Sequence, residues 1–197
     1  MNNILSIMSS LNGEQGNSAI LANELLSSLA KTAKVNIIKR DLAQQNLSHL
    51  SQQEVAAWMT PANERNNEQI QLANISDTLV EELKASDTLV IGMPMINFGI
   101  PSTFKTWVDR IARAGITFNY TENGPVGLLN NKKVIIIATR GGMYAGTNKD
   151  SQSQYLKDFF TFIGIKDISF IYAEGLNMPG KEESLLAAKT AIKNLIN

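Results

Sequence analysis

The sequence predicts a three-layer α/β sandwich, in which helices cover both faces of a five-stranded parallel sheet. Two observations lead to this fold class. Short apolar runs rich in β-branched residues alternate with segments of helical periodicity, which is typical of βα units. Residues 134–137 are apolar at every position, as expected of a strand that is buried on both faces. We expect the strand order 2-1-3-4-5 and right-handed crossovers.

The predicted elements follow one another along the chain. Strands are expected at 3–8, 34–41, 87–94, 132–142 and 167–175. Helices are expected at about 18–32, 67–84, 102–115, 151–163 and 180–196. The polar stretch 43–68 has no strong period and is interpreted as an insertion with short helices. No boundary is visible in the sequence, so a single domain over 1–197 is predicted.

The composition excludes several kinds of chemistry. Eighteen basic and eighteen acidic side chains give a net charge of zero, which speaks against a nucleic-acid partner. The chain has no cysteine and one histidine, so thiol catalysis, a metal site and a Ser-His-Asp triad are not expected. It shows no signal sequence or membrane span, which predicts a cytoplasmic protein. The chemistry of an enzyme with these side chains would come from a bound organic cofactor.

Ligands of such a sheet bind at the carboxyl ends of its strands. The loop 9–18 follows the carboxyl end of the first predicted strand. Its sequence, SSLNGEQGNS, matches neither G-x-G-x-x-G nor the P-loop. The helix that follows could hold a phosphate through its free N–H groups, with Asn17 or Ser18 as N-cap. No Lys or Arg occurs in residues 1–30, so the donors would be neutral and Glu14 would point away. An ordinary capped helix is the alternative.

Two further strand ends have unusual loops. In residues 93–101, Gly99 permits a close approach or a positive φ between two stiffening prolines, which suits a flat heteroaromatic ligand. The alternative is that Phe98 packs into the core. In residues 138–144, two glycines leave backbone N–H groups exposed, although a flexible turn would look the same. All three loops fall on one edge of the sheet, which favours a shared binding site.

The motifs MPMINF (93–98), ARAGITFNYTENGP (112–125) and TRGGMY (139–144) strongly resemble the FMN-dependent NADH-azoreductase family. The resemblance extends over nearly the whole chain, through FIGI (162–165) to AEG (173–175). It implies a flavodoxin-like fold, FMN as cofactor and a homodimer that makes its pocket at a two-fold interface. It also implies NADH or NADPH as the donor, and quinones or azo compounds as oxidants.

The family pattern can be carried over to individual residues. The resemblance implies that the phosphate-binding loop consists of Ser10, Gly16, Asn17 and Ser18. The loops along the flavin ring would be Met95, Ile96, Asn97 and Phe98 on one side, and Thr139, Arg140, Gly141 and Gly142 on the other. Tyr120 and Phe162 would line the substrate pocket, the latter from the partner subunit.

Some positions depart from the family pattern. The family commonly has tyrosine at the position of Ile96, and often serine at that of Asn17 or Thr139. Loss of the tyrosine bears on substrate preference more than on flavin binding, since a loop that binds through its backbone tolerates the change. Arg140 is a candidate counter-charge for the reduced ring, and Asn97 could supply an amide to the polar edge of the flavin.

The implied reaction is a two-electron, ping-pong hydride relay in which NAD(P)H and then the oxidant use the same flavin face. A rival hypothesis is a flavodoxin-type electron carrier without a small-molecule substrate of its own. Such carriers are typically strongly acidic, whereas this chain is neutral and has the additional loop GITFNYTENGPVG at 115–127. A binding or sensing protein without turnover is a third possibility.

Overall fold

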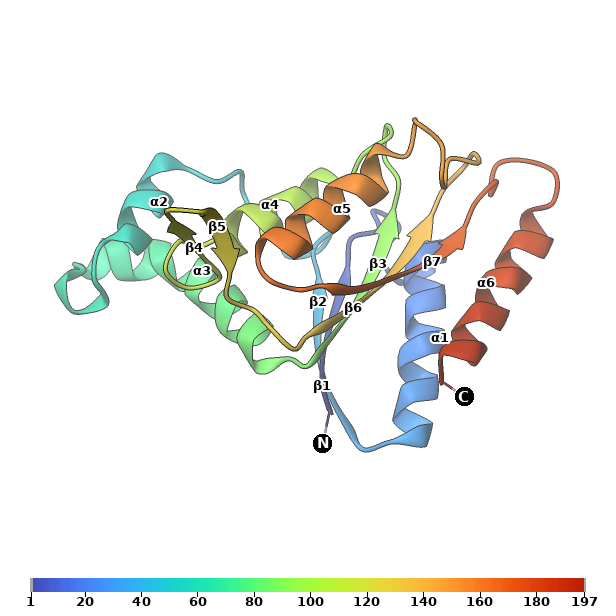
Figure 1. Ribbon diagram of the computed structural model, residues 1–197, viewed down its shortest axis with the longest axis horizontal. Helices are drawn as coiled ribbons and strands as arrows, with labels where there is room; N and C mark the ends of the chain where they lie inside the picture. The colour runs from blue at the N-terminus through green and yellow to red at the C-terminus, as the bar shows by residue number, and fades with distance from the viewer. Residues whose placement is uncertain (1, 197) are drawn as a thin grey trace.

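The computed structural model describes residues 2–196 and contains the predicted parallel sheet (Figure 1). Its five strands pair in the order β2-β1-β3-β6-β7, and every neighbouring pair is parallel. Counted along the sheet-forming strands alone, this order is 2-1-3-4-5, so the predicted topology is confirmed. The strands are β1 (Asn2–Met8), β2 (Val35–Asp41), β3 (Thr88–Pro94), β6 (Lys133–Thr139) and β7 (Asp167–Ala173).

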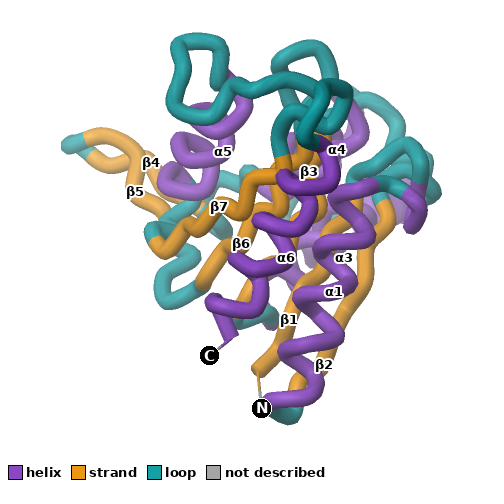
Figure 2. The backbone as a smooth tube through the Cα atoms, turned by 90° about the vertical axis from the view of Figure 1, so that its right-hand side faces the viewer, coloured by secondary structure: helices purple, strands orange, loops and turns teal. Residues whose placement is uncertain are grey.

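Helices cover both faces of the sheet, and each face has its own apolar core (Figure 2). The helices α1 (Asn17–Thr32) and α6 (Lys181–Ile196) pack on one face. The helices α3 (Asn67–Ala85), α4 (Ser102–Ile111) and α5 (Ser151–Phe162) pack on the other. Alternation of side chains along a strand explains the division, since Leu89 and Ile91 join one core and Val90 the other.

The polar insertion folds as short helices, as expected. It contains α2 (Gln52–Met59) and a 3-10 helix (Ala62–Glu64). Ser51 begins α2 with a capping box, in which its hydroxyl accepts the Glu54 N–H and the Glu54 carboxylate accepts the Ser51 N–H. The carboxylate of Glu54 also pairs with buried Arg110 of α4, which fixes the insertion to the sheet-covering layer.

The predicted helix 102–115 was too long, because α4 ends at Ile111. The hydroxyl of Thr117 accepts the Arg113 N–H at 2.8 Å and donates to the Ile111 carbonyl at 2.7 Å. This side chain takes the backbone groups that another helical turn would need. Gly115 then reverses the chain with a φ of +81°.

The segment expected as a loop at 115–127 contains a β-hairpin instead. Its strands are β4 (Phe118–Thr121) and β5 (Gly124–Gly127), which pair antiparallel. Gly124 adopts a φ of +102° after the two-residue turn, and the Thr121 hydroxyl donates to its carbonyl at 2.7 Å. The hairpin extends beyond the end of α5 that lies away from the strand-end loops (Figures 1 and 2).

Candidate functional site

Backbone hydrogen bonds join the strand-end loops into one continuous edge. The N–H and hydroxyl of Ser9, after β1, both donate to the Gly92 carbonyl in β3, at 3.3 and 2.9 Å. The Met95 N–H, after β3, donates to the carbonyl of Thr139 at the end of β6, at 2.9 Å. The side chain of Thr139 is itself buried. The three loops that the sequence placed on one edge are therefore held together there.

The first loop is folded tightly around Ser10. A Cβ atom at Gly16 would lie 2.0 Å from the Ser10 hydroxyl oxygen, so only glycine fits at this position. The loop brings Gly16 to the N-cap of α1, where no side chain caps the helix. Within residues 2–196, the N–H groups of Asn17, Ser18 and Ala19 donate to no protein acceptor. This helix end offers free N–H donors and a positive dipole end next to a buried serine.

The second loop turns at Asn97 and Phe98, which both have a positive φ, of 47° and 67°. Ile96 and Gly99 exchange backbone hydrogen bonds across them at 3.0 and 2.9 Å. A two-residue turn with positive φ at both central positions is the type I′ arrangement. The left-handed conformation thus falls on the two non-glycine residues and not on Gly99. Non-glycine residues in this region are strained and concentrate at functional sites.

The helix α5 holds this strained turn in place. The hydroxyl of Ser151 donates to the Phe98 carbonyl at 2.6 Å. The side-chain amide of Gln152 donates to the carbonyls of Pro94 and Gly99, both at 3.0 Å. Helix α5 thus fixes the backbone at both ends of the turn. Phe98 is 52% exposed and does not pack into the core, which was the alternative considered above.

A cavity of about 270 Å³ lies between the second and third loops. Its lining residues are Met95, Asn97, Phe98, Gly141, Gly142, Tyr144 and Asn177. Five of these were predicted as site residues, while Tyr144 and Asn177 were not. Tyr144 lies two residues after the glycine pair. Asn177 lies after β7 between Gly175 and Pro179-Gly180, a pattern that could have marked a fourth strand-end loop. Ile96 is 38% exposed at the corner of the turn and does not line this cavity.

The guanidinium of Arg140 faces the protein interior and not this cavity. Its side chain is fully buried, 2.7 Å from the Asp150 carboxylate and 3.1 Å from that of Glu174. It also donates to the Ser153 hydroxyl at 2.7 Å and lies over the ring of Tyr172. The expected role as a counter-charge is at odds with this geometry, because two carboxylates already neutralise the guanidinium.

The charge of Asp150 is stabilised by this cluster. Burial acts to raise the pKa of Asp150, but hydrogen bonds from Arg140 and Ser153 outweigh it and hold the pKa below its ordinary value. The same carboxylate caps α5 by accepting the Ser153 N–H at 3.1 Å. The cluster thus ties the start of α5 to the third loop.

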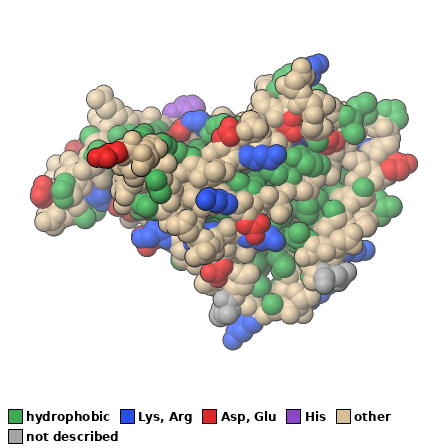
Figure 3. All heavy atoms as spheres, viewed as in Figure 1, with side chains coloured by type: hydrophobic (Ala, Val, Ile, Leu, Met, Phe, Trp, Pro, Cys, Tyr) green, Lys and Arg blue, Asp and Glu red, His purple; other side chains and the backbone are tan. Residues whose placement is uncertain are grey.

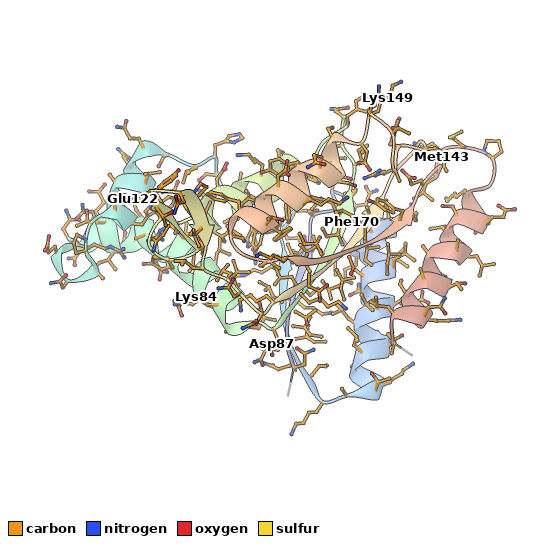
Figure 4. The ribbon with its side chains drawn as sticks, viewed as in Figure 1. Lys84, Asp87, Glu122, Met143, Lys149 and Phe170 are labelled. Atoms are coloured by element: carbon orange, nitrogen blue, oxygen red, sulfur yellow. The ribbon has the colours of Figure 1, made fainter. Side chains whose placement is uncertain are left out.

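Tyr120 and Phe162 both pack against Phe118, and neither lines the cavity of its own chain. Phe118 lies between them, with its ring centroid 5.4 Å from that of Tyr120 and 4.4 Å from that of Phe162. Phe162 ends α5, about 16 Å from Ser151 at 1.5 Å per residue. Figure 4 shows Glu122, in the turn of the same hairpin, on the opposite side of the view from Lys149 and from Met143 of the third loop.

The doubly wound sheet, with an uncapped helix end and a cavity at its carboxyl edge, defines the class of α/β proteins that bind a nucleotide-like ligand at the strand ends. A family model for the flavodoxin-like fold matches residues 2–196, and the chain belongs to this family.

Two relatives match over the full length of this chain. An FMN-dependent NADH:quinone oxidoreductase from Alteromonas mediterranea is 54% identical over 196 residues, covering 100% of this chain and 98% of the relative. The protein of the same description from Cellvibrio japonicus is 50% identical over 198 residues, covering 100% and 99%.

A solved structure has the same fold. It is an FMN-dependent NADH-azoreductase from Bacillus anthracis in complex with FMN, which superimposes with a TM-score of 0.91 at 26% identity. The match covers 100% of this chain and 98% of that one.

Residues 2–196 contain neither a candidate membrane span nor a candidate metal site. Residues 2–196 contain no helix that is both long and apolar enough to cross a bilayer. They also contain no group of three or more His, Cys, Asp or Glu side chains placed to hold a metal ion.

Proposed function

We propose that this protein is an FMN-dependent NAD(P)H oxidoreductase, built as one domain, that reduces quinones and azo compounds. The observation that carries the proposal is the uncapped start of α1 on the same sheet edge as the cavity between the second and third loops. Full-length relatives at 54% and 50% identity that are FMN-dependent NADH:quinone oxidoreductases support it.

The residues at the sheet edge fit this cofactor. The free N–H groups of Asn17 and Ser18 and the hydroxyl of Ser10 would hold the phosphate, which needs no basic side chain at a helix N-terminus. The backbone of residues 95–98 and 141–142 would lie along the ring. FMN when bound supplies reversible two-electron chemistry, accepting a hydride from the donor and passing it to the oxidant.

The protein groups in this proposal bind and orient, and none acts as a strong acid or base. The strained turn at Asn97 and Phe98 is fixed by α5 before any ligand arrives, so its N–H groups need little reorganisation. The Asn97 amide lines the cavity and is available for polar edges of a flat ligand. The proposal includes ping-pong order, in which donor and oxidant stack in turn on the same face of the bound flavin.

A homodimer would complete the site. Tyr120 is 75% exposed on a hairpin that does not reach the cavity of its own chain, and Phe162 stacks against the same hairpin through Phe118. In a two-fold dimer these rings could wall the cavity of the partner, because an isologous interface brings the same pair of surfaces together twice. We further propose a cytoplasmic location, with no nucleic-acid or membrane partner.

An electron carrier is less well supported. Such proteins dock through a strongly acidic surface, whereas Figure 3 shows acidic and basic side chains mixed over one face, in keeping with the net charge of zero. A carrier also has no need of the aromatic hairpin.

An anaerobic titration tests the proposal. Purified protein loaded with FMN is treated with NADH and then with a quinone while the visible spectrum is recorded. We expect the flavin band to bleach and then return. A yellow protein that ignores both NADH and NADPH would favour the electron carrier, and a protein that cannot be reconstituted with FMN would refute the cofactor site.

A further inference from the structure

The backbone of Arg113 holds the base of the β4–β5 hairpin. Its N–H donates to the Thr117 hydroxyl at 2.8 Å, and its carbonyl accepts the N–H groups of Ile116 and Thr117 at 3.1 and 2.9 Å. The N–H of Phe118, the first residue of β4, also reaches this carbonyl at 3.4 Å. The direction in which the hairpin leaves the body of the protein is therefore set at Arg113.

The side chain of Arg113 is fixed in turn by α2 and α3, which lie beside the base of the hairpin (Figure 1). The guanidinium donates to the Ser76 hydroxyl at 2.7 Å and to the Asp77 carboxylate at 3.0 Å, both in α3. It also donates to the Trp58 carbonyl at 3.3 Å and lies 4.8 Å from the centroid of the Trp58 ring, a cation–π contact. One buried side chain thus ties the hairpin to two helices.

Arg65 has some of the same partners as Arg113. Its guanidinium lies 2.7 Å from the Asp77 carboxylate and donates to the Trp58 carbonyl at 3.2 Å. Arg113 is therefore not needed to neutralise Asp77 or to satisfy that carbonyl. Within residues 2–196, Arg65 makes no hydrogen bond to the hairpin, so the link to the hairpin is what distinguishes the two arginines.

The ring of Tyr120 depends on the hairpin backbone for its position. It is 75% exposed, so little packing surrounds it, and its edge-to-face contact is with Phe118. Any change in the direction of the hairpin would therefore move this ring. A charged side chain that is costly to bury has its best-attested use in fixing the arrangement of other elements.

We propose that Arg113 is a positioning residue for the oxidant, which places the Tyr120 ring through the hairpin. This inference rests on the proposed function, in which the hairpin of one chain walls the cavity of its partner. Arg113 itself touches neither the oxidant nor the cofactor in this proposal, since it does not line the cavity. It also gives a physical reason for the motif ARAGITFNY, because the arginine and the threonine of this motif together set the base of the hairpin.

The test compares Arg113→Met with Arg65→Met. Both variants remove a guanidinium from Asp77 and from the Trp58 carbonyl, but only Arg113→Met releases the hairpin. The FMN-loaded proteins are assayed with NADH and either 2-methyl-1,4-naphthoquinone, a flat ring compound, or ferricyanide, which has no ring to contact Tyr120. The kcat/KM for each oxidant is measured, and hydrogen exchange followed by mass spectrometry reports opening of residues 118–127.

We expect Arg113→Met to lower kcat/KM for the naphthoquinone by roughly 2- to 10-fold, the range of one aromatic contact, and to leave that for ferricyanide unchanged. The amides of the hairpin should exchange faster, because its base is no longer anchored. Arg65→Met should lower the unfolding temperature, but change neither the ratio of the two kcat/KM values nor hairpin exchange. FMN affinity should match wild type in both variants.

The conservative variant Arg113→Lys gives a second measurement. Lysine keeps the charge and can reach Asp77, but it lacks the planar fork that also reaches Ser76 and the Trp58 carbonyl. We therefore expect a smaller change in the ratio of the two kcat/KM values than in Arg113→Met. This variant also replaces Arg113→Met in the comparison if the latter does not fold.

Two results would overturn the proposal. The first is a wild-type ratio of the two kcat/KM values in the Arg113 variants, even where the hairpin exchanges faster. The second is an equal change of this ratio in Arg65→Met. Failure of the proposed function would be distinct, because the wild-type protein would then bind no FMN, ignore NADH or sediment as a monomer before any variant is compared.

Discussion

The carboxylate of Glu174 lies 3.1 Å from the buried guanidinium of Arg140, and the same oxygen accepts the N–H groups of Tyr144 and Ala145 at 2.8 Å. A charge pair inside the protein thus fixes the backbone conformation at the end of the third loop. Because the oxygen also accepts two amide N–H groups, its desolvation is compensated by hydrogen bonds as well as by charge. The shape of the cavity rim depends on this pair, although neither charge faces the ligand.

Replacing Arg140 should be costly. Arg140→Met leaves the carboxylates of Asp150 and Glu174 buried without their partner, and breaking such a pair typically lowers the free energy of unfolding by about 3–5 kcal/mol. Urea denaturation measures the change. The control is Lys105→Met, which removes the i,i+4 ion pair with Asp109 on the exposed side of α4 and should cost about 0.5 kcal/mol or less. Equal losses in the two variants would show that the cluster does not stabilise the fold.

The stability of the protein should fall in acid partly through Asp150. Its pKa in the folded state lies below the ordinary value, so the folded state favours the charged form. The stabilisation is present above about pH 4 and is lost as the pH falls through the lowered pKa. Asp150→Asn keeps an oxygen to cap α5 and removes the charge. Its unfolding free energy should be lower at pH 7 and should depend less steeply on pH below about 4. The account would be contradicted if the unfolding free energies of wild type and Asp150→Asn fell equally steeply below about pH 4.

The sheet could be predicted from the sequence because its central strands β3 and β6 are short, continuous apolar runs between periodic helices, a pattern that burial on both faces imposes. The hairpin was not predicted, although residues 116–121 alternate apolar and polar side chains and Asn123-Gly124 is a common hairpin turn pair. Its strands are short and expose Tyr120 and Val126, so it lacks the continuous apolar run that marks the central sheet strands. The site was predicted in outline, from glycines and from the family motif. The direction of the Arg140 side chain depends on Asp150 and Glu174, which are 10 and 34 residues away in sequence, and no local pattern encodes that contact.

Two variants at Asn97 separate the effect of backbone strain in the turn from the effect of losing the side-chain amide. At a φ of 47°, Asn97→Leu adds strain of about 1 kcal/mol and also removes the amide, whereas Asn97→Gly removes the amide without strain. We expect both variants to bind FMN more weakly, and only Asn97→Leu to lose stability. Fluorescence titration of the apoprotein with FMN and thermal unfolding measure the two effects. Unchanged FMN affinity in Asn97→Gly would mean that the amide does not contact the flavin.

The first loop should tolerate no side chain at Gly16. A Cβ atom there would meet the Ser10 side chain at 2.0 Å, so Gly16→Ala must displace the serine or the start of α1. Because the variant would lose a hydrogen bond to the charged phosphate, we expect Gly16→Ala to bind FMN at least about tenfold more weakly than wild type. Exposed Glu14 in the same loop gives the control, because Glu14→Gln should leave FMN affinity within about twofold. If Gly16→Ala bound FMN as tightly as wild type, the phosphate would have to lie elsewhere.

Subunit mixing tests whether two chains build each site. Tyr120→Ala should keep FMN but lose quinone turnover, because it removes an exposed ring from the hairpin. Gly16→Ala should bind FMN about tenfold more weakly or worse, so the assay uses an FMN concentration at which the site of this variant is largely empty. In a mixed dimer, the chain with intact Gly16 holds FMN and its partner supplies an intact Tyr120, so one of the two sites works. Random pairing makes about half of the dimers mixed, which predicts recovery of about a quarter of wild-type turnover.

The mixing experiment needs both variants in one cell, with different affinity tags and sequential purification to isolate mixed dimers. Those dimers should recover about half of wild-type turnover, because one of their two sites is complete. The matched control is a dimer in which both chains carry Tyr120→Ala and each chain has a different tag. This dimer should stay inactive. If the pure mixed dimers also lack turnover, or if sedimentation shows that the wild-type chain is a monomer, then Tyr120 does not act across an interface. The exposed aromatic hairpin would then need another explanation.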